Sequence, residues 1–188
     1  MNFETFNPEI HDMGEVAQLV YDVDFRTFDM FYKNKKGAIK DISKMILKEK
    51  SPYFKVILEN DEIIGIIYFY IHEKPSFIHS LLGVTSFKLL LIDILDHFVL
   101  SDVNENDLHI GMLAISDKCR GKGVGSEVLN LVIEEAKKRD FSRVTLDADF
   151  RNTKAKKLYE KIGFKEFNKK SVKIGKFERG MYNMEYVL

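Results

Sequence analysis

The chain has 188 residues, 45% hydrophobic and 31% charged, and it carries 29 basic and 29 acidic side chains. This balance offers no electrostatic argument for a nucleic-acid or membrane partner, and we expect neither. Cys119 is the only cysteine, so no internal disulfide can form. The first ten residues lack the basic and apolar regions of a signal peptide. We therefore expect a cytoplasmic protein.

In the first half of the chain, the periodicity of apolar residues predicts both strands and helices. Asp12 and Glu15 have the spacing of a helix start ahead of Val16. Residues 63–71 are apolar almost throughout, which is typical of a central strand covered on both faces. The predicted elements are a strand over 2–6, a helix after Asp12, a helix over 38–50, two strands around a turn at 59–62, and a helix in the second half of 77–100 carrying Leu90, Ile94 and Phe98.

The second half of the chain reads as strand, helix, strand, helix and two further strands. The predicted elements are a strand over 107–115, a helix ending near 139, a strand over 143–149, a helix over 153–162, and two long strands within 164–188 with a turn near 175–180. The whole order predicts one domain over 1–188, with a mixed sheet and flanking helices, of the α/β or α+β class.

The loop that follows the strand 107–115 contains three alternating glycines, Gly121, Gly123 and Gly125, and the cations Arg120 and Lys122. A Walker phosphate loop requires Ser or Thr after its lysine, and here Gly123 follows. A dinucleotide fingerprint requires G-x-G-x-x-G, whereas the spacing here is G-x-G-x-G. Neither nucleotide motif fits this loop.

Elementary helix chemistry gives this loop another role. The first N–H groups of a helix have no intrahelical partner and carry the positive end of the helix dipole. Glycines allow an anion to approach the backbone closely, and two cations add charge. We interpret the loop as an anion site suited to phosphate or pyrophosphate; the alternative is an ordinary glycine turn.

A second motif, RNTKAKKLYEKIGFKEF, begins at residue 151. Asn152 has the position of a helix cap, and Gly163 that of the residue after the helix. With the first motif, R-x-x-G-x-G, it resembles the GNAT superfamily of acyl-CoA-dependent N-acetyltransferases over roughly 108–167. The residues that carry this resemblance are Arg120, Gly123, Gly125, Asn152, Ala155, Tyr159, Gly163 and Phe164.

The resemblance implies a mixed, mostly antiparallel central sheet flanked by helices. The apolar helical insert 74–103 between two sheet strands departs from the family pattern, in which these strands are joined more tightly. The resemblance also implies direct transfer of an acetyl group from acetyl-CoA to a primary amine in a ternary complex, without a metal. The acceptor would be a small-molecule amine or a protein amino group. The alternative function is a non-catalytic acyl-CoA-binding regulatory module on the same scaffold.

The resemblance further implies which residues bind coenzyme A. Leu113 and Ile115 would pair through their main chain with the pantetheine arm, and Tyr159, a phenol with an ordinary pKa near 10, would protonate the departing thiolate. The alternative for Tyr159 is a core aromatic. The full set is Leu113, Ala114, Ile115, Arg120, Gly121, Lys122, Gly123, Val124, Gly125, Ser126, Asn152 and Tyr159.

Two side chains near these motifs have open roles. His109 lies on the predicted strand in alternation with Leu113, and a histidine pKa near 6.5 suits the base that deprotonates the amine. The alternative for His109 is a partly exposed histidine at a strand end. Cys119 lies next to the glycine loop, and we expect a structural or incidental role for it.

Two further segments border the motifs in sequence. The insert 74–103 could be a lid over the acceptor site, a homodimer contact or an extra core helix. Asp22, Asp24 and Asp29 alternate with aromatic residues, which would suit a cationic amine or belong to an ordinary surface helix.

Overall fold

The computed structural model describes residues 1–48, 52–71, 87–175 and 177–188. Residues 74–86 of the predicted insert and the predicted helix end at 49–50 lie outside this part. The helices and strands are β1 (Asn2–Thr5), α1 (Met13–Val23), α2 (Phe25–Phe31), α3 (Lys35–Lys48), β2 (Phe54–Glu59), β3 (Glu62–Ile71), α5 (Phe87–Val99), β4 (Asp107–Ile115), the 3-10 helix η1 (Asp117–Cys119), α6 (Val124–Lys138), β5 (Arg143–Asp149), α7 (Thr153–Ile162), β6 (Lys165–Ile174) and β7 (Phe177–Val187).

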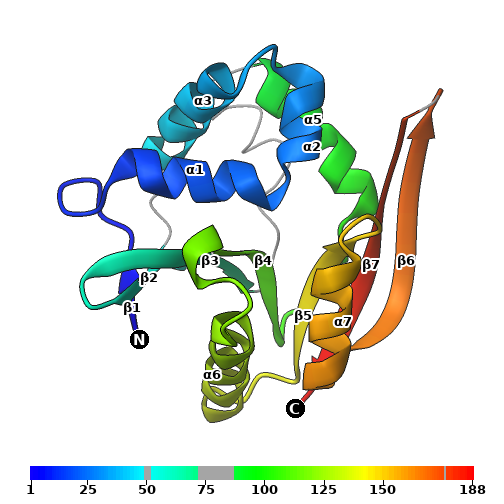
Figure 1. Cartoon of the computed structure of the whole chain (residues 1–188). Helices are drawn as coiled ribbons and strands as arrows, with labels where there is room; N and C mark the ends of the chain where they lie inside the picture. The colour runs from blue at the N-terminus through cyan, green and yellow to red at the C-terminus, as the bar shows by residue number, and fades with distance from the viewer. Residues whose placement is uncertain (49–51, 72–86, 176) are drawn as a thin grey trace. The chain divides into compact units, whose positions relative to one another are not determined.

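The seven strands form one mostly antiparallel sheet in the order β1-β2-β3-β4-β5-β7-β6 (Figure 1). The pairing of β4 with β5 is parallel and runs from Asp107 and Arg143 to Ile110 and Leu146. The neighbouring pairs β1–β2, β2–β3, β5–β7 and β6–β7 are antiparallel. This sheet confirms the predicted fold class.

The chain packs as two compact units, which we describe separately. The first contains β1, α1, α2, α3, β2, most of β3, the first half of α5 and the end of β4. The second contains the rest of α5, the start of β4, α6, β5, α7, β6 and β7. A single domain over 1–188 stays a prediction.

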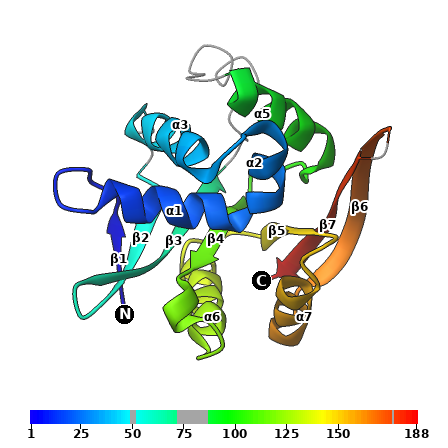
Figure 2. The ribbon, with the colours of Figure 1, turned by 45° about the horizontal axis from the view of Figure 1, so that its top comes forward.

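Three helices and the central strand β3 build the core of the first unit. Asp12 begins α1 as predicted, because its carboxylate accepts a hydrogen bond of 2.7 Å from the Glu15 amide. α1, α2 and α3 pack together (Figure 2) and bury Val16 and Ile42 completely. Ile66 and Ile67 of β3 point to opposite faces and are both fully buried, as expected for a central strand.

In the second unit, helices cover one face of the sheet. α6 and α7 both pack against β5 (Figure 1). The buried apolar residues Val144, Leu146 and Ala148 alternate along β5 with Thr145, Asp147 and Asp149. The two sets point to opposite faces, so β5 presents a polar face on the side away from its apolar residues.

The structure differs from the prediction in α2, in α3 and in β7, which begins at Phe177 inside the turn predicted near 175–180. The prediction did not include α2 as a separate helix, because seven residues contain too few helical turns to show a clear period of apolar residues. α3 begins at Lys35, three residues before the predicted start at Ala38. α5 confirms the predicted helix and contains Leu90, Ile94 and Phe98, but the residues buried on it are Ile92, Leu95 and Val99, and Phe98 is 59% exposed.

Gly65 on β3 is required by a close approach of the backbone. A Cβ at this position would lie 2.5 Å from the carbonyl oxygen of Ala114 and 3.0 Å from the side chain of Ile115. We expect Gly65→Ala to lower the free energy of unfolding by about 1–3 kcal/mol in urea titrations, because the neighbouring strand must move. Gly37→Ala in α3 is the matched control.

A Cβ at Gly37 would make only ordinary contacts, the nearest at 3.5 Å from Asn34. Since glycine is unfavourable within a helix, the control should be neutral or more stable by up to about 1 kcal/mol. Equal stability of the two variants would show that the close approach at Gly65 is not a packing constraint.

Candidate functional site

The glycine loop enters α6 through two residues with left-handed backbone. Gly121 has φ 77° and Gly123, the N-cap, has φ 88°, and a Cβ at either would meet no atom within 4 Å. The first helical hydrogen bond runs from the Glu127 amide to the Gly123 carbonyl, and no side chain caps the helix. The amides of Val124, Gly125 and Ser126 therefore have no intrahelical acceptor.

The two cations of the loop differ in their environment. The Arg120 Nε donates a 3.0 Å hydrogen bond to the Ile115 carbonyl, and the same guanidinium pairs with Asp117. Lys122 is exposed. Part of the Arg120 charge is thus neutralised locally, and the amides at the start of α6 add the positive end of the helix dipole.

The residues expected to hold the pantetheine arm lie at the end of β4. Ala114 is buried, while Leu113 and Ile115 are half-buried. The pairing of β4 with β5 ends at Ile110, so these three residues lie beyond the last paired position.

α7 carries the second motif with the expected caps. Asn152 accepts a 3.2 Å hydrogen bond from the Ala155 amide, and Gly163 ends the helix with φ 117°. A Cβ at Gly125 would lie 3.4 Å from the Leu158 side chain, so the glycine allows α6 to lie close to α7.

Tyr159 is half-buried on α7, and its ring packs against Phe164 with centroids 6.0 Å apart. Burial raises the pKa of its hydroxyl to about 12, above the ordinary value expected from the sequence. Among the residues that the structure describes, no hydrogen-bond partner of this hydroxyl is found.

The predicted site residues divide between the two units. Gly123, Val124, Gly125 and Ser126 share the second unit with Asn152 and Tyr159. Leu113, Ala114, Ile115, Arg120, Gly121 and Lys122 belong to the first. His109 belongs to the second unit.

His109 is only 1% exposed, so the alternative of a partly exposed strand-end histidine was wrong. Its Nδ1 lies 2.9 Å from the Thr145 hydroxyl, and its Nε2 lies 3.5 Å from an Asp147 carboxylate oxygen. Asp147 also accepts hydrogen bonds from Ser101 and Asn183. Sequence reasoning missed this group, although the alternation of Thr145, Asp147 and Asp149 signalled a polar sheet face.

Asp149, at the end of β5, is bonded to the side chain and the amide of Arg151. Burial alone would raise the pKa of this carboxyl, but the Arg151 hydrogen bonds and charge outweigh burial and lower it. Asp149 is thus an ionised carboxylate with a cationic partner.

The acidic residues of the N-terminal helices are also engaged. Asp29 accepts a 2.5 Å hydrogen bond from the Tyr21 hydroxyl, which raises the pKa of Tyr21 to about 12. Asp22 accepts a 2.6 Å hydrogen bond from Gln18 and lies 3.9 Å from the Lys35 ammonium. A role of these acids toward a cationic amine stays a prediction.

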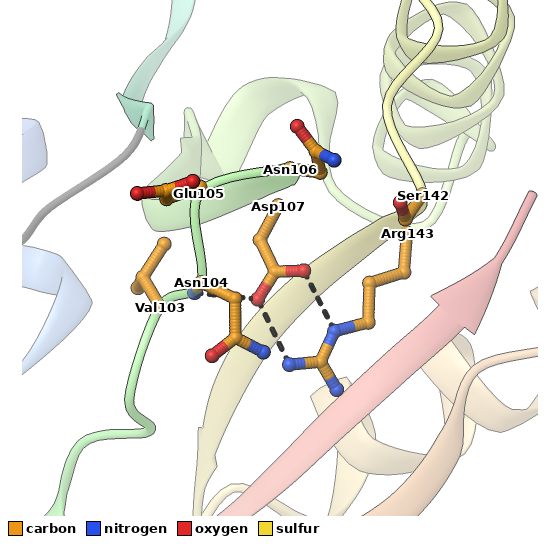
Figure 3. A pocket seen from close by; sticks show the side chains of 7 residues that line it. All are labelled: Val103, Asn104, Glu105, Asn106, Asp107, Ser142 and Arg143. Atoms are coloured by element: carbon orange, nitrogen blue, oxygen red, sulfur yellow. Dashed lines mark hydrogen bonds and ion pairs between the residues drawn. The ribbon is translucent and has the colours of Figure 1, made fainter.

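A hollow of about 660 Å³ lies at the amino-terminal ends of β4 and β5 (Figure 3). Asp107 there makes two 2.8 Å hydrogen bonds with Arg143, which also binds Glu185. These charges satisfy one another. The hollow is lined by Val103, Asn104, Glu105, Asn106, Asp107, Ser142 and Arg143.

The described residues contain neither a metal-binding cluster nor a helix able to cross a membrane. They contain no group of three or more His, Cys, Asp or Glu side chains placed to hold a metal ion. Within the same residues, none of the helices has the length and apolar character needed to span a bilayer.

Comparison with known proteins identifies the fold and the family. The structure resembles an N-acetyltransferase from Staphylococcus aureus Mu50, with a TM-score of 0.71 and 18% identity over 99% of this chain and 100% of that one. It also resembles Ard1 from Thermoplasma volcanium, with a TM-score of 0.59 and 16% identity over 100% of this chain and 97% of the other. At these identities the likeness concerns the fold.

The relatives found by sequence are also acetyltransferases by name. The N-alpha-acetyltransferase 30 of Schizosaccharomyces pombe is 25% identical over 135 residues, which cover 67% of this chain and 77% of the relative. The Xenopus laevis protein of the same name is 38% identical over 56 residues, 30% of this chain and 20% of the relative. The sequence model of the Acetyltransferase (GNAT) family matches residues 17–164, and the chain therefore belongs to this family of acetyltransferases.

Proposed function

We propose that this protein transfers an acetyl group from acetyl-CoA directly to a primary amine. The observation that carries the proposal is the uncapped terminus of α6, entered through two left-handed glycines. Oriented amides, a helix dipole and the exposed Lys122 together suit the pyrophosphate of coenzyme A. A cytoplasmic location and a homodimer remain predictions beside this proposal.

The remaining cofactor contacts follow the family motifs. Backbone groups from Arg120 to Ser126 would hold the pyrophosphate, and the main chain of Leu113, Ala114 and Ile115 would pair with the pantetheine arm. Asn152 would contact the same arm, beside its observed role as the α7 cap. These contacts would hold the thioester in place for attack by the amine.

The hydroxyl of Tyr159 would interact with the sulfur of the leaving thiolate. The amine nitrogen forms a bond to the thioester carbon, the carbon–sulfur bond breaks, and a base accepts the proton that the nitrogen loses. A phenol of pKa about 12 is fully protonated at neutral pH. Complete transfer of its proton to a thiolate whose conjugate thiol has a pKa near 8.5 would be unfavourable, because the phenol is the weaker acid.

We therefore assign Tyr159 the role of a hydrogen-bond donor to the developing thiolate, with bulk solvent completing the protonation. Such a donor stabilises charge that develops in the transition state, and it needs no pKa match with the sulfur. The raised pKa of Tyr159 thus changes the role expected from the sequence, from proton transfer to charge stabilisation.

For the acceptor we propose the α-amino group at the N-terminus of a protein or peptide. Two relatives are named N-alpha-acetyltransferase 30, and one of them aligns with two thirds of this chain. This choice narrows the sequence-based alternatives, a small amine or any protein amino group.

Gly123→Glu tests the anion site. We expect acetyl-CoA binding to weaken at least tenfold in calorimetry, because a carboxylate would occupy the space in front of the α6 amides. Gly175→Glu is the matched control, since Gly175 also has positive φ (61°) and no atom within 4 Å of a Cβ, but lies in the β6–β7 turn. Equal affinities of the two variants for acetyl-CoA would show that the anion site does not lie at the α6 terminus.

An acceptor panel tests the reaction. Release of free thiol from acetyl-CoA should occur with a peptide that has a free α-amine, and should be lost when the same peptide is blocked at its N-terminus but keeps a lysine. Preference for a small amine would overturn the acceptor assignment. Acetyl-CoA binding without thiol release from any amine would instead support the non-catalytic acyl-CoA-binding module.

Tyr159→Phe tests the donor. Turnover should fall about 10- to 100-fold while the Kd for acetyl-CoA changes less than threefold, because the phenol acts on charge that develops only in the transition state. The matched control is Tyr182→Phe on β7, a half-buried tyrosine in the same unit. Unchanged turnover of Tyr159→Phe would exclude the assignment.

A further inference from the structure

Five polar side chains gather on the polar face of the sheet in the second unit; we call them the Asp147 cluster. Opposite partners in the sheet share a face, and His109 is opposite Thr145 while Asp147 is opposite Asn183. Ser101, two residues after the end of α5, completes the group. The cluster is Ser101, His109, Thr145, Asp147 and Asn183.

Asp147 lies at the centre of this cluster. Its side chain is 6% exposed, and its carboxylate accepts hydrogen bonds from the Ser101 amide at 3.1 Å and from the Asn183 Nδ2 at 2.5 Å. The Nε2 of His109 lies 3.5 Å from the same carboxylate. A buried carboxylate needs such donors, because it lacks water as a partner.

Asn183 ties the cluster to α5. The same Nδ2 that bonds Asp147 also donates to the carbonyl of Val99, the last residue of α5, at 3.2 Å. Its Oδ1 is buried, and within the described part of the chain it has no hydrogen-bond partner. The two bonds donated by Nδ2 therefore hold this amide in place.

The position of the cluster in the chain places it close in sequence to α7, which carries Tyr159. The pairing of β4 with β5 ends at Ile110 and Leu146, and Asp147 is the next residue of β5. Two residues further β5 ends at Asp149, and α7 begins at Thr153 with Tyr159 on its second turn. The pairing of β5 with β7 continues to Asp149, and the cluster adds side-chain contacts to it at the end of the strand from which the Tyr159 helix starts.

Both ring nitrogens of His109 face protein atoms, and the ring is almost completely buried. A general base must instead present a nitrogen to the amine or to a water bound to it. We propose that His109 is a positioning residue: it holds Asp147 and, through Asp147, the end of β5 that carries α7. This inference rests on the proposed acetyl transfer.

The test compares His109→Gln with His109→Ala. The glutamine amide can donate to Asp147 from near the place of Nε2, whereas alanine leaves the carboxylate without this donor. We expect His109→Ala to lower kcat at least tenfold, because misplacing a reacting group is costly. His109→Gln should recover most of that loss, with the acidic limb of the pH–rate profile unmoved.

A base role would give the opposite pattern. Glutamine cannot accept the proton at neutral pH, so both variants would then lose kcat about 10²- to 10⁴-fold and the acidic limb would disappear. That outcome would overturn the inference. His97→Ala, at an exposed histidine of α5, controls for the loss of an imidazole.

A second measurement does not depend on turnover. Amide hydrogen exchange of residues 147–159 should become at least tenfold faster in His109→Ala and stay near wild type in His109→Gln. Unchanged exchange in His109→Ala would overturn the positioning role even if the wild-type protein acetylates its acceptor. If the wild type releases no thiol with any amine, the proposed function fails, and exchange alone decides the role of His109.

Discussion

A buried carboxylate, Asp147, is the constraint on which the second unit depends. Its side chain is only 6% exposed, so it requires polar partners, which come from the segment after α5 and from β4 and β7. Satisfying one carboxylate thereby ties together the segment after α5 and the strands β4, β5 and β7. A hydrophobic contact would tolerate more sliding between the strands, because dispersion forces have little direction.

The start of α6, where we propose the anion site, depends on the absence of a capping side chain. A helix terminus without a capping side chain has amides that can donate hydrogen bonds to a ligand. Gly121 and Gly123 have left-handed backbone, and no atom lies within 4 Å of where their Cβ atoms would be. α7 shows the contrast, since Asn152 caps it from within the chain. The two helices thus differ: the α7 terminus is capped from within the chain, whereas the α6 terminus keeps amides without an intrahelical acceptor, where we propose that the pyrophosphate binds.

Local chemistry made much of the fold predictable. The bounds of β4, β5 and α7 agree with the sequence-based prediction, because period, caps and glycines act within a few residues. Periodicity did not decide which side of α5 is buried, because burial depends on partners far along the chain. Ile92, Leu95 and Val99 are buried there, whereas Phe98 is 59% exposed.

The sequence by itself determined the family and the two motifs, since Gly123, Asn152 and Tyr159 are recognised by spacing along the chain. Only the tertiary structure decided the environment of these side chains. It raised the pKa of Tyr159 by burial, and it enclosed His109 between Thr145 and Asp147. The reason is physical: a pKa and a hydrogen-bond partner depend on neighbours in space, and residues 109 and 145 meet only when β4 pairs with β5.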